Sequence, residues 1–199
     1  IIIGMLEEAE RARMIRNAKK YEERSIAPVV TEMVGGSPHF PSGYKLKKRT
    51  DDFIWVSYDP EYVSQGILIY KYPVVEGEDM MSLDNIIENT DKMLKNNVPG
   101  MFENTYMMTS TFARPGIQYM KYKGLDFASI HGFWEVYNDY MGGPFVSYTT
   151  VNKATNEVFT IDCYVYHPKK PKKRNLLRDL QHLVYMVNFP TQSAEAAAE

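Results

Sequence analysis

Residues 140–189 read YMGGPFVSYTTVNKATNEVFTIDCYVYHPKKPKKRNLLRDLQHLVYMVNF. Two parts of this stretch, Phe145–Val151 and Val158–His167, are rich in β-branched and aromatic residues and predict two strands. Met141-Gly142-Gly143-Pro144 is predicted to be a turn, because glycine accepts positive φ and proline fixes the exit of the chain. The last part repeats apolar residues at helical spacing, which predicts a helix packed on the sheet: Leu176, Leu177, Leu180, Leu183, Val184 and Val187.

The N-terminal part of the chain is predicted to be helical. Met5–Arg24 is rich in Glu, Arg, Lys and Ala, which favours a solvated helix with a narrow apolar side. Ser25 is predicted to cap a second, short helix, with Pro28 in its first turn and Gly35-Gly36 at its end. The chain starts without methionine, and we expect it to begin part-way through a longer protein.

From Tyr44 onward the apolar pattern changes to a period of two, which is typical of strands. The predicted strands before the opening stretch are Tyr44–Lys48, Phe53–Tyr58, Gly66–Tyr72, Thr105–Phe112, Ile117–Lys123 and Asp126–Tyr137. After the third of them, Ser82 is predicted to cap a helix whose apolar residues share one face: Leu83, Ile86, Ile87, Met93 and Leu94.

This order predicts an α+β fold with a mainly antiparallel sheet of about eight strands. One helix follows the third strand and another ends the domain. We divide the chain into an N-terminal helical segment over residues 1–36, an α+β sandwich domain over residues 37–190, and a disordered or tag-like tail over residues 191–199.

Composition limits the function classes. The chain has 199 residues, of which 44% are apolar, and this is enough to form a core. A net charge of −2 gives no global attraction to nucleic acid or to an anionic membrane. The single cysteine, Cys163, excludes an internal disulfide and is predicted to be a buried small hydrophobe.

Strand alternation allows one catalytic hypothesis. On their own strands, His131 and Glu135 share a face, and Asp162 lies on one face of a later strand. If these faces coincide, His131 meets a carboxylate with Ser147 nearby, and an acid–base or nucleophilic site results. An ordinary polar sheet face explains the same residues. The chain has no phosphate loop, dinucleotide fingerprint or metal-binding histidine spacing, so we expect no cofactor and no metal.

A basic run precedes the last helix and consists of Lys169, Lys170, Lys172, Lys173 and Arg174. Backbone N–H groups at a helix N-terminus already attract anions, so the run is a candidate site for phosphate, a lipid head group or an acidic partner. A solvated turn flanked by Pro168 and Pro171 is the ordinary explanation of such a run. Aromatic residues do not alternate with these lysines, which argues against single-stranded nucleic acid.

Three segments of the chain carry a resemblance to known proteins. Phe53-Ile54-Trp55, the residues from Tyr140 to Ser147 and the residues from Lys172 to Arg178 resemble a family of uncharacterised Bacteroidetes proteins, catalogued as a domain of unknown function. The resemblance extends from about Ala9 to Phe189. Members are usually longer at the N-terminus and often carry a lipoprotein signal, which this chain lacks. The order of helices and strands also resembles that of Mog1/PsbP-like domains.

The resemblance implies no activity and no catalytic residues. It favours a non-catalytic binding or accessory protein of the cell envelope. We expect a periplasm-facing lipoprotein whose only membrane attachment is a lipid anchor outside this chain. The expected partner is a protein or a small ligand, not nucleic acid. The alternative is a hydrolase with its site on the sheet face near His131 and Asp162.

Overall fold

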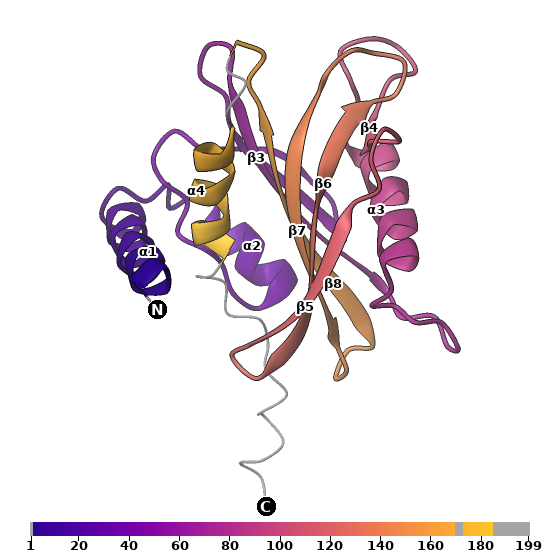
Figure 1. The fold of residues 1–199 in the computed structure, drawn as a ribbon, viewed down its shortest axis with the longest axis horizontal. Coiled ribbons are helices and arrows are strands. Elements are labelled where there is room, and N and C mark those ends of the chain that lie inside the picture. The colour runs from indigo at the N-terminus through magenta and orange to yellow at the C-terminus, as the bar shows by residue number, and fades with distance from the viewer. Residues whose placement is uncertain (1, 170–172, 185–199) are drawn as a thin grey trace, which may run out of the picture.

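The computed structural model describes residues 2–169 and 173–184, which form four helices and an eight-stranded sheet (Figure 1). The helices are α1 (Ile2–Lys20), α2 (Ala27–Val34), α3 (Leu83–Asn97) and α4 (Arg174–Val184). The strands are β1 (Lys45–Arg49), β2 (Phe53–Tyr58), β3 (Ser64–Pro73), β4 (Met107–Thr109), β5 (Gly116–Tyr122), β6 (Leu125–Val136), β7 (Gly142–Asn152) and β8 (Glu157–Tyr166).

All neighbouring strands of the sheet are antiparallel, in the order β1-β2-β3-β8-β7-β6-β4. β5 also pairs with β6, so β4 and β5 follow one another along the same edge of that long strand. The predicted α+β class, the antiparallel sheet, the helix after the third strand and the C-terminal helix are confirmed.

The sheet has helices on both faces (Figure 1). α3 covers one face, whereas α2 and α4 cover the other, and α1 lies outside α4. Each face therefore has its own hydrophobic core. Ile26, Val30 and Val34 belong to the core under α2 and α4, so residues ahead of position 37 contribute directly to the packing of the sheet domain.

The glycines of the opening stretch do not form the predicted turn. Gly142 and Gly143 lie inside β7, and the reversal of the chain before them uses Asn138, which has a φ of 60°. The glycines are needed for close approach instead. A Cβ atom on Gly143 would collide with the carbonyl oxygen of Val165, and one on Gly142 would lie 2.7 Å from the carbonyl oxygen of Trp134.

Two predicted helix caps have different outcomes. Ser82 caps α3 as predicted, because its Oγ accepts a hydrogen bond of 3.4 Å from the N–H of Asn85. Ser25 does not cap α2. Its Oγ donates to Glu23 Oε1 at 2.7 Å, and Ile26 occupies the capping position without a side-chain bond.

The strand predicted over residues 105–112 is much shorter in the structure. β4 ends at Thr109 because the next residues turn toward Glu135 of β6. Ser110 Oγ donates to Glu135 Oε2 at 2.7 Å, and the N–H of Thr111 donates to Oε1 at 3.3 Å. The N–H of Ser110 still donates to the carbonyl of Phe133 in β6 at 2.7 Å, and beyond it the Glu135 bonds take the place of the strand pairing.

Candidate functional site

The predicted catalytic residues lie on two different faces of the sheet. His131 is directly opposite Val146, whose side chain packs under α2 and α4. Asp162 is directly opposite Ser147 on one side and Leu68 on the other, and Leu68 packs under α3. Opposed residues on neighbouring strands point to the same face, so His131 and Asp162 are separated by the sheet. The condition for the predicted acid–base site is not met.

His131 and Glu135 have local partners instead. His131 Nε2 lies 3.2 Å from Ser129 Oγ, and burial lowers the pKa of the His131 imidazole. The Glu135 carboxylate accepts the hydrogen bonds from Ser110 and Thr111 described above. A serine next to a histidine resembles part of a nucleophilic site, but neither hydrogen-bonds to a carboxylate among the described residues.

Ser147 and Asp162 belong to a row of buried polar side chains between α3 and the sheet, which we call the polar seam. Tyr70 Oη donates to Asp162 Oδ2 at 2.6 Å and lies 2.8 Å from Thr90 Oγ1 of α3. The seam consists of Tyr70, Thr90, Thr109, Ser147, Thr149, Thr160 and Asp162, all of them buried. The polar seam therefore adds hydrogen bonds to the apolar contacts between α3 and the sheet.

Burial dominates the electrostatics of the seam. Asp162 is 3% exposed, and desolvation raises the pKa of its carboxyl group from 3.8 to about 6. The Tyr70 hydrogen bond and the nearby Ser147 hydroxyl lower this pKa, and the charge of Asp91 raises it further. The Ser147 hydroxyl faces Asp162 but makes no hydrogen bond of normal geometry. Asp162 thus exchanges a proton close to neutral pH.

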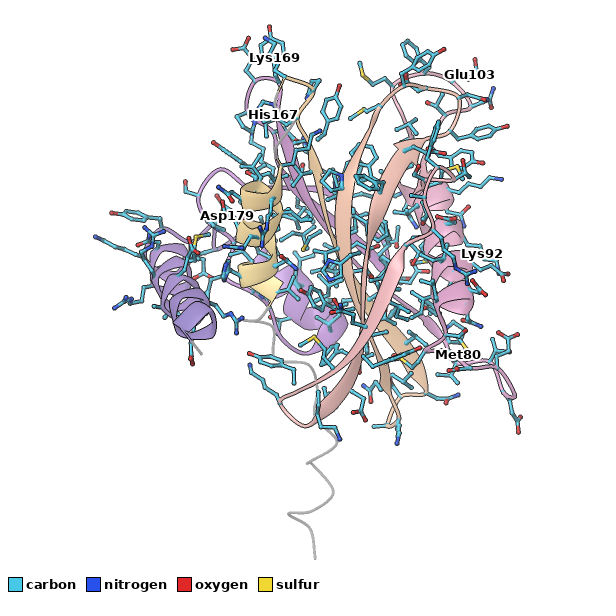
Figure 2. The ribbon with its side chains drawn as sticks, in the orientation of Figure 1. Met80, Lys92, Glu103, His167, Lys169 and Asp179 are labelled. Atoms are coloured by element: carbon cyan, nitrogen blue, oxygen red, sulfur yellow. The ribbon has the colours of Figure 1, made fainter. Side chains whose placement is uncertain are left out.

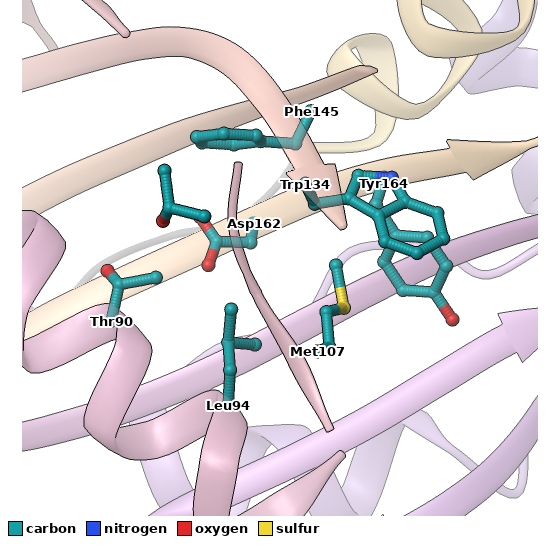
Figure 3. Close-up of a pocket in the computed structure, with 8 residues that line it drawn as sticks. Thr90, Leu94, Met107, Trp134, Phe145, Asp162 and Tyr164 are labelled. Carbon is teal, nitrogen blue, oxygen red and sulfur yellow. The ribbon is translucent and has the colours of Figure 1, made fainter. Parts of the chain in front are cut away.

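A small cavity lies against the seam (Figure 3). Its volume is about 10 Å³, and its walls are Thr90, Leu94, Met107, Thr109, Trp134, Phe145, Asp162 and Tyr164. Figure 3 shows the Asp162 carboxyl group pointing across the cavity toward Thr90 and Leu94 of α3. A space of this size holds no more than one water molecule, so an organic substrate cannot reach Asp162.

One end of the molecule exposes a group of large apolar side chains, which we call the aromatic end. It consists of the exposed Met101, Phe102, Tyr137 and Tyr140 and the half-buried Tyr106, from the loop between α3 and β4 and the turn between β6 and β7. Figure 1 shows these two connections projecting from the same end of the sheet.

Backbone and ring contacts hold the two connections together. The N–H of Tyr137 donates to the carbonyl of Tyr106 at 2.8 Å, and the two rings stack with centroids 5.0 Å apart. Lys95 Nζ lies 5.2 Å from the Tyr106 ring centroid. Despite this order, Met101 is 82% exposed and Phe102 is 65% exposed, and Tyr140 is fully open to solvent. The sequence alone did not identify this surface, because Tyr137 fits the end of a predicted strand.

The basic run is described only in part. Lys169 is exposed, and its Nζ lies 3.4 Å from the centroid of the Tyr62 ring. Lys173 and Arg174 stand at the N-terminus of α4, as predicted. Lys170 and Lys172 lie outside the described residues. Anion binding at this run therefore stays a prediction.

A larger hollow of about 400 Å³ lies at the opposite end from Glu103, near Met80 (Figure 2). It is formed by the loop before α3, the turn between β5 and β6, and the end of β7: Val74, Glu78, Asp79, Met80, Met81, Gly124, Leu125, Asp126, Thr150, Val151 and Lys153. Its mixed charge and its open shape indicate no particular ligand class.

Metal and membrane sites were searched over the described residues only. Within them, no group of three or more His, Cys, Asp or Glu side chains is placed to hold a metal ion. Likewise, none of the helices in the described part of the chain combines the length and apolar character needed to span a membrane. Cys163 is buried in the sheet, as predicted.

Comparison with known proteins gives a family but no activity. No curated protein sequence matches the chain. Among solved structures, a point mutant of the protein Mog1 is similar over 80% of this chain and 94% of its own, with 10% identity and a TM-score of 0.46. The profile of the family described as "Domain of unknown function (DUF4837)" matches residues 23–186. The chain, from α2 to the end of α4, therefore belongs to the DUF4837 family.

Proposed function

We propose that this protein is a non-catalytic binding or accessory protein and that its aromatic end binds another protein. The exposed aromatic and methionine side chains of this end carry the proposal. Apolar side chains gathered on a surface cost solubility, and exposed patches of this kind mark interaction sites. Tyrosine, phenylalanine and methionine are also enriched at the centres of protein interfaces.

The charges around the aromatic end favour a protein partner over a lipid surface. Glu103 is exposed beside Phe102, and Asp139 precedes Tyr140 in the turn between β6 and β7. Lys95 also reaches this end, but its Nζ lies against the Tyr106 ring. Carboxylates at these positions would be repelled by anionic lipid head groups. The complementary surface is an apolar patch of a protein with lysine or arginine residues at its rim.

The enclosed seam supports a non-catalytic role. Burial raises the carboxyl pKa of Asp162 to about 6, which would suit a group that transfers protons. However, the cavity beside Asp162 admits only a water-sized molecule. His131 lies on the other face of the sheet. A hydrolase that uses these two residues together would need them on one face.

A position in the cell envelope and a lipid anchor upstream of this chain are further parts of the proposal. They rest on the resemblance of the sequence to a family whose members often carry a lipoprotein signal. Expression of the full-length precursor with a labelled fatty acid, followed by membrane fractionation, tests both. Recovery of unlabelled protein in the cytosolic fraction would refute them.

Site-specific photocrosslinking tests the aromatic end. A photoreactive phenylalanine is placed at Phe102 or Tyr140 in the full-length protein in its native cells. Tyr119 is the matched control, because it is 65% exposed, like Phe102, but lies on β5. We expect one protein to crosslink at Phe102 and Tyr140 and not at Tyr119.

The crosslinked partner is then purified and its affinity measured. Phe102→Ser and Tyr140→Ser should each weaken binding by about 10-fold or more, as expected for a side chain at the centre of an interface, whereas Tyr119→Ser should leave it unchanged. Unchanged binding by the first two variants would refute the proposal. Crosslinks to lipid, or to a second copy of this chain, would also refute it.

A further inference from the structure

We infer that the free edge of β5 pairs with the same strand of a second copy of this chain, so that two sheets join into one. β5 pairs with β6 on one side, and no strand of the described residues pairs with it on the other. An open strand edge is a template for another strand, because its unpaired N–H and C=O groups can form a further ladder. Proteins usually protect such edges, and the edges of this sheet differ in their protection.

The edge at β1 is protected by charge and by irregular pairing. Four of its five residues are cations: Lys45, Lys47, Lys48 and Arg49. Its pairing with β2 shifts register between Leu46 and Lys48. Positive side chains and bulges both discourage pairing with a further strand, and β4, with three residues, is too short to act as a template.

β5 has none of these devices. Its seven residues, Gly116–Tyr122, keep one register with β6 from end to end. The sequence of the strand is GIQYMKY, in which Lys121 alone is charged and the isoleucine and tyrosines favour a strand. The side chain of Tyr119 is 65% exposed. A regular, nearly neutral strand with an open edge is the kind that pairs with another chain.

The backbone bonds of β6 show which groups of β5 are free. The N–H of Ser110 donates to the carbonyl of Phe133, so the odd-numbered residues of β6 direct their backbone groups toward β4 and β5. The register places the even-numbered residues of β5 opposite them. The N–H and C=O groups of Ile117, Tyr119 and Lys121 therefore point away from β6, toward the free edge.

These three residues make the edge self-complementary. When two copies of β5 run antiparallel about a two-fold axis at Tyr119, that residue faces its own copy and Ile117 faces the partner's Lys121. Each of these pairs can exchange two backbone hydrogen bonds, which gives about six across the axis. The charges also fit, because the one cation of the strand lies opposite an isoleucine and like charges do not oppose each other.

The contact is small and separate from the aromatic end. Pairing over one strand edge buries less area than a stable dimer interface, so we expect weak association that depends on concentration. The β5–β6 turn and the β6–β7 turn lie at opposite ends of β6. A second copy crosslinked from residue 119 is therefore compatible with the function proposed above, whereas one crosslinked from Phe102 or Tyr140 is not.

Charge exchange at Tyr119 tests the position of the axis. Tyr119→Lys and Tyr119→Glu each oppose like charges across the axis, so each variant alone should be monomeric in sedimentation velocity at concentrations where the wild type forms a dimer. An equimolar mixture of the two should form a dimer, because opposite charges then face each other. Phe102→Lys is the matched control, since Phe102 is equally exposed but lies at the aromatic end, and it should dimerise like the wild type.

Amide hydrogen exchange of the wild type tests the edge without substitutions. The N–H groups of Ile117, Tyr119 and Lys121 should exchange several-fold more slowly in a concentrated sample than in a dilute one. Those of Gln118 and Met120, which face β6, should be equally protected in both.

A wild type that stays monomeric up to about 1 mM would overturn the inference. So would a monomeric mixture of the two charged variants, or a dimer that persists in each of them alone. Slow exchange at Ile117, Tyr119 and Lys121 at every concentration would also overturn it, because another segment of the chain would then cover this edge.

Discussion

Asp162→Asn tests the electrostatics of the polar seam. In the folded protein, burial raises the pKa of Asp162 from 3.8 to about 6. Asparagine has nearly the same shape and still offers an oxygen to the Tyr70 hydroxyl, but it cannot ionise. The variant therefore removes the titration of residue 162 while leaving the tyrosine contact in place.

The sign of the effect follows from which state binds the proton more tightly. Because the folded pKa is the higher one, the unfolded chain releases its proton first as the pH rises from about 4. The stability that Asp162 contributes is complete below pH 3.8 and is lost as the pH rises through about 6. A shift of this size corresponds to a loss of about 3 kcal/mol between acid and neutral pH.

Urea unfolding of both proteins between pH 4 and pH 8 measures the loss. The free energy of unfolding of Asp162→Asn minus that of the wild type should increase by about 2.4 kcal/mol from pH 4 to pH 7 and then stay level, because part of the total is already lost at pH 4. Asp179, whose carboxyl pKa burial also raises, titrates in both proteins and cancels in the difference. Asp91 interacts with the charge of Asp162, so the difference reports residue 162 together with its coupling to Asp91. A part of this difference that is the same at every pH reflects the amide protons of asparagine, which aspartate does not have.

Parallel stability curves for the two proteins would refute this account of the seam. They would mean that Asp162 has the same proton affinity in the folded and unfolded states. Its carboxylate would then be solvated far better than its burial and its contact with Tyr70 imply. A difference that decreases with rising pH would show that stabilising hydrogen bonds outweigh desolvation.

Three further predictions concern the glycines, the helix caps and the aromatic end. Gly143→Ala should lower the free energy of unfolding by about 1–3 kcal/mol through its collision with β8, whereas Gly116→Ala, which meets nothing within 4 Å, should change it little in the same urea experiment. Ser82→Ala should cost about 1 kcal/mol, and Ser25→Ala should cost close to nothing, because only Ser82 caps a helix. Phe102→Ser should leave the unfolding temperature unchanged while reducing the binding of an apolar dye, since its ring is mostly in solvent.

Local patterns were enough to predict most of the fold. β2 was predicted with its observed bounds, Phe53–Tyr58, because a run of apolar and aromatic residues lies between two turns. The cap at Ser82 was also predicted, since the apolar spacing after it is helical. These features depend on neighbours in the sequence. The role of Gly143 was not predicted because the atom it approaches, the Val165 carbonyl oxygen, belongs to a different strand.

The arrangement of the candidate catalytic residues depends on strand register, which local patterns do not contain. Within β6 the alternation correctly places residues two apart on one face. Whether that face coincides with the one that bears Asp162 depends on pairings such as His131 with Val146 and Ser147 with Asp162. A shift of one residue in either pairing would place His131 and Asp162 on one face. The turns between β6, β7 and β8 therefore decide whether these side chains can share a site.

The same dependence decides which tyrosines become part of the core and which reach the surface. Tyrosines such as Tyr70 and Tyr137 have the same intrinsic preference for strands. Tyr70 is completely buried and binds Asp162, whereas Tyr137 lies at the edge of a turn and is 45% exposed. Only the positions of α3 and of the β6–β7 turn distinguish them. Burial makes Tyr70 part of the core, whereas Tyr137 keeps part of its ring in solvent.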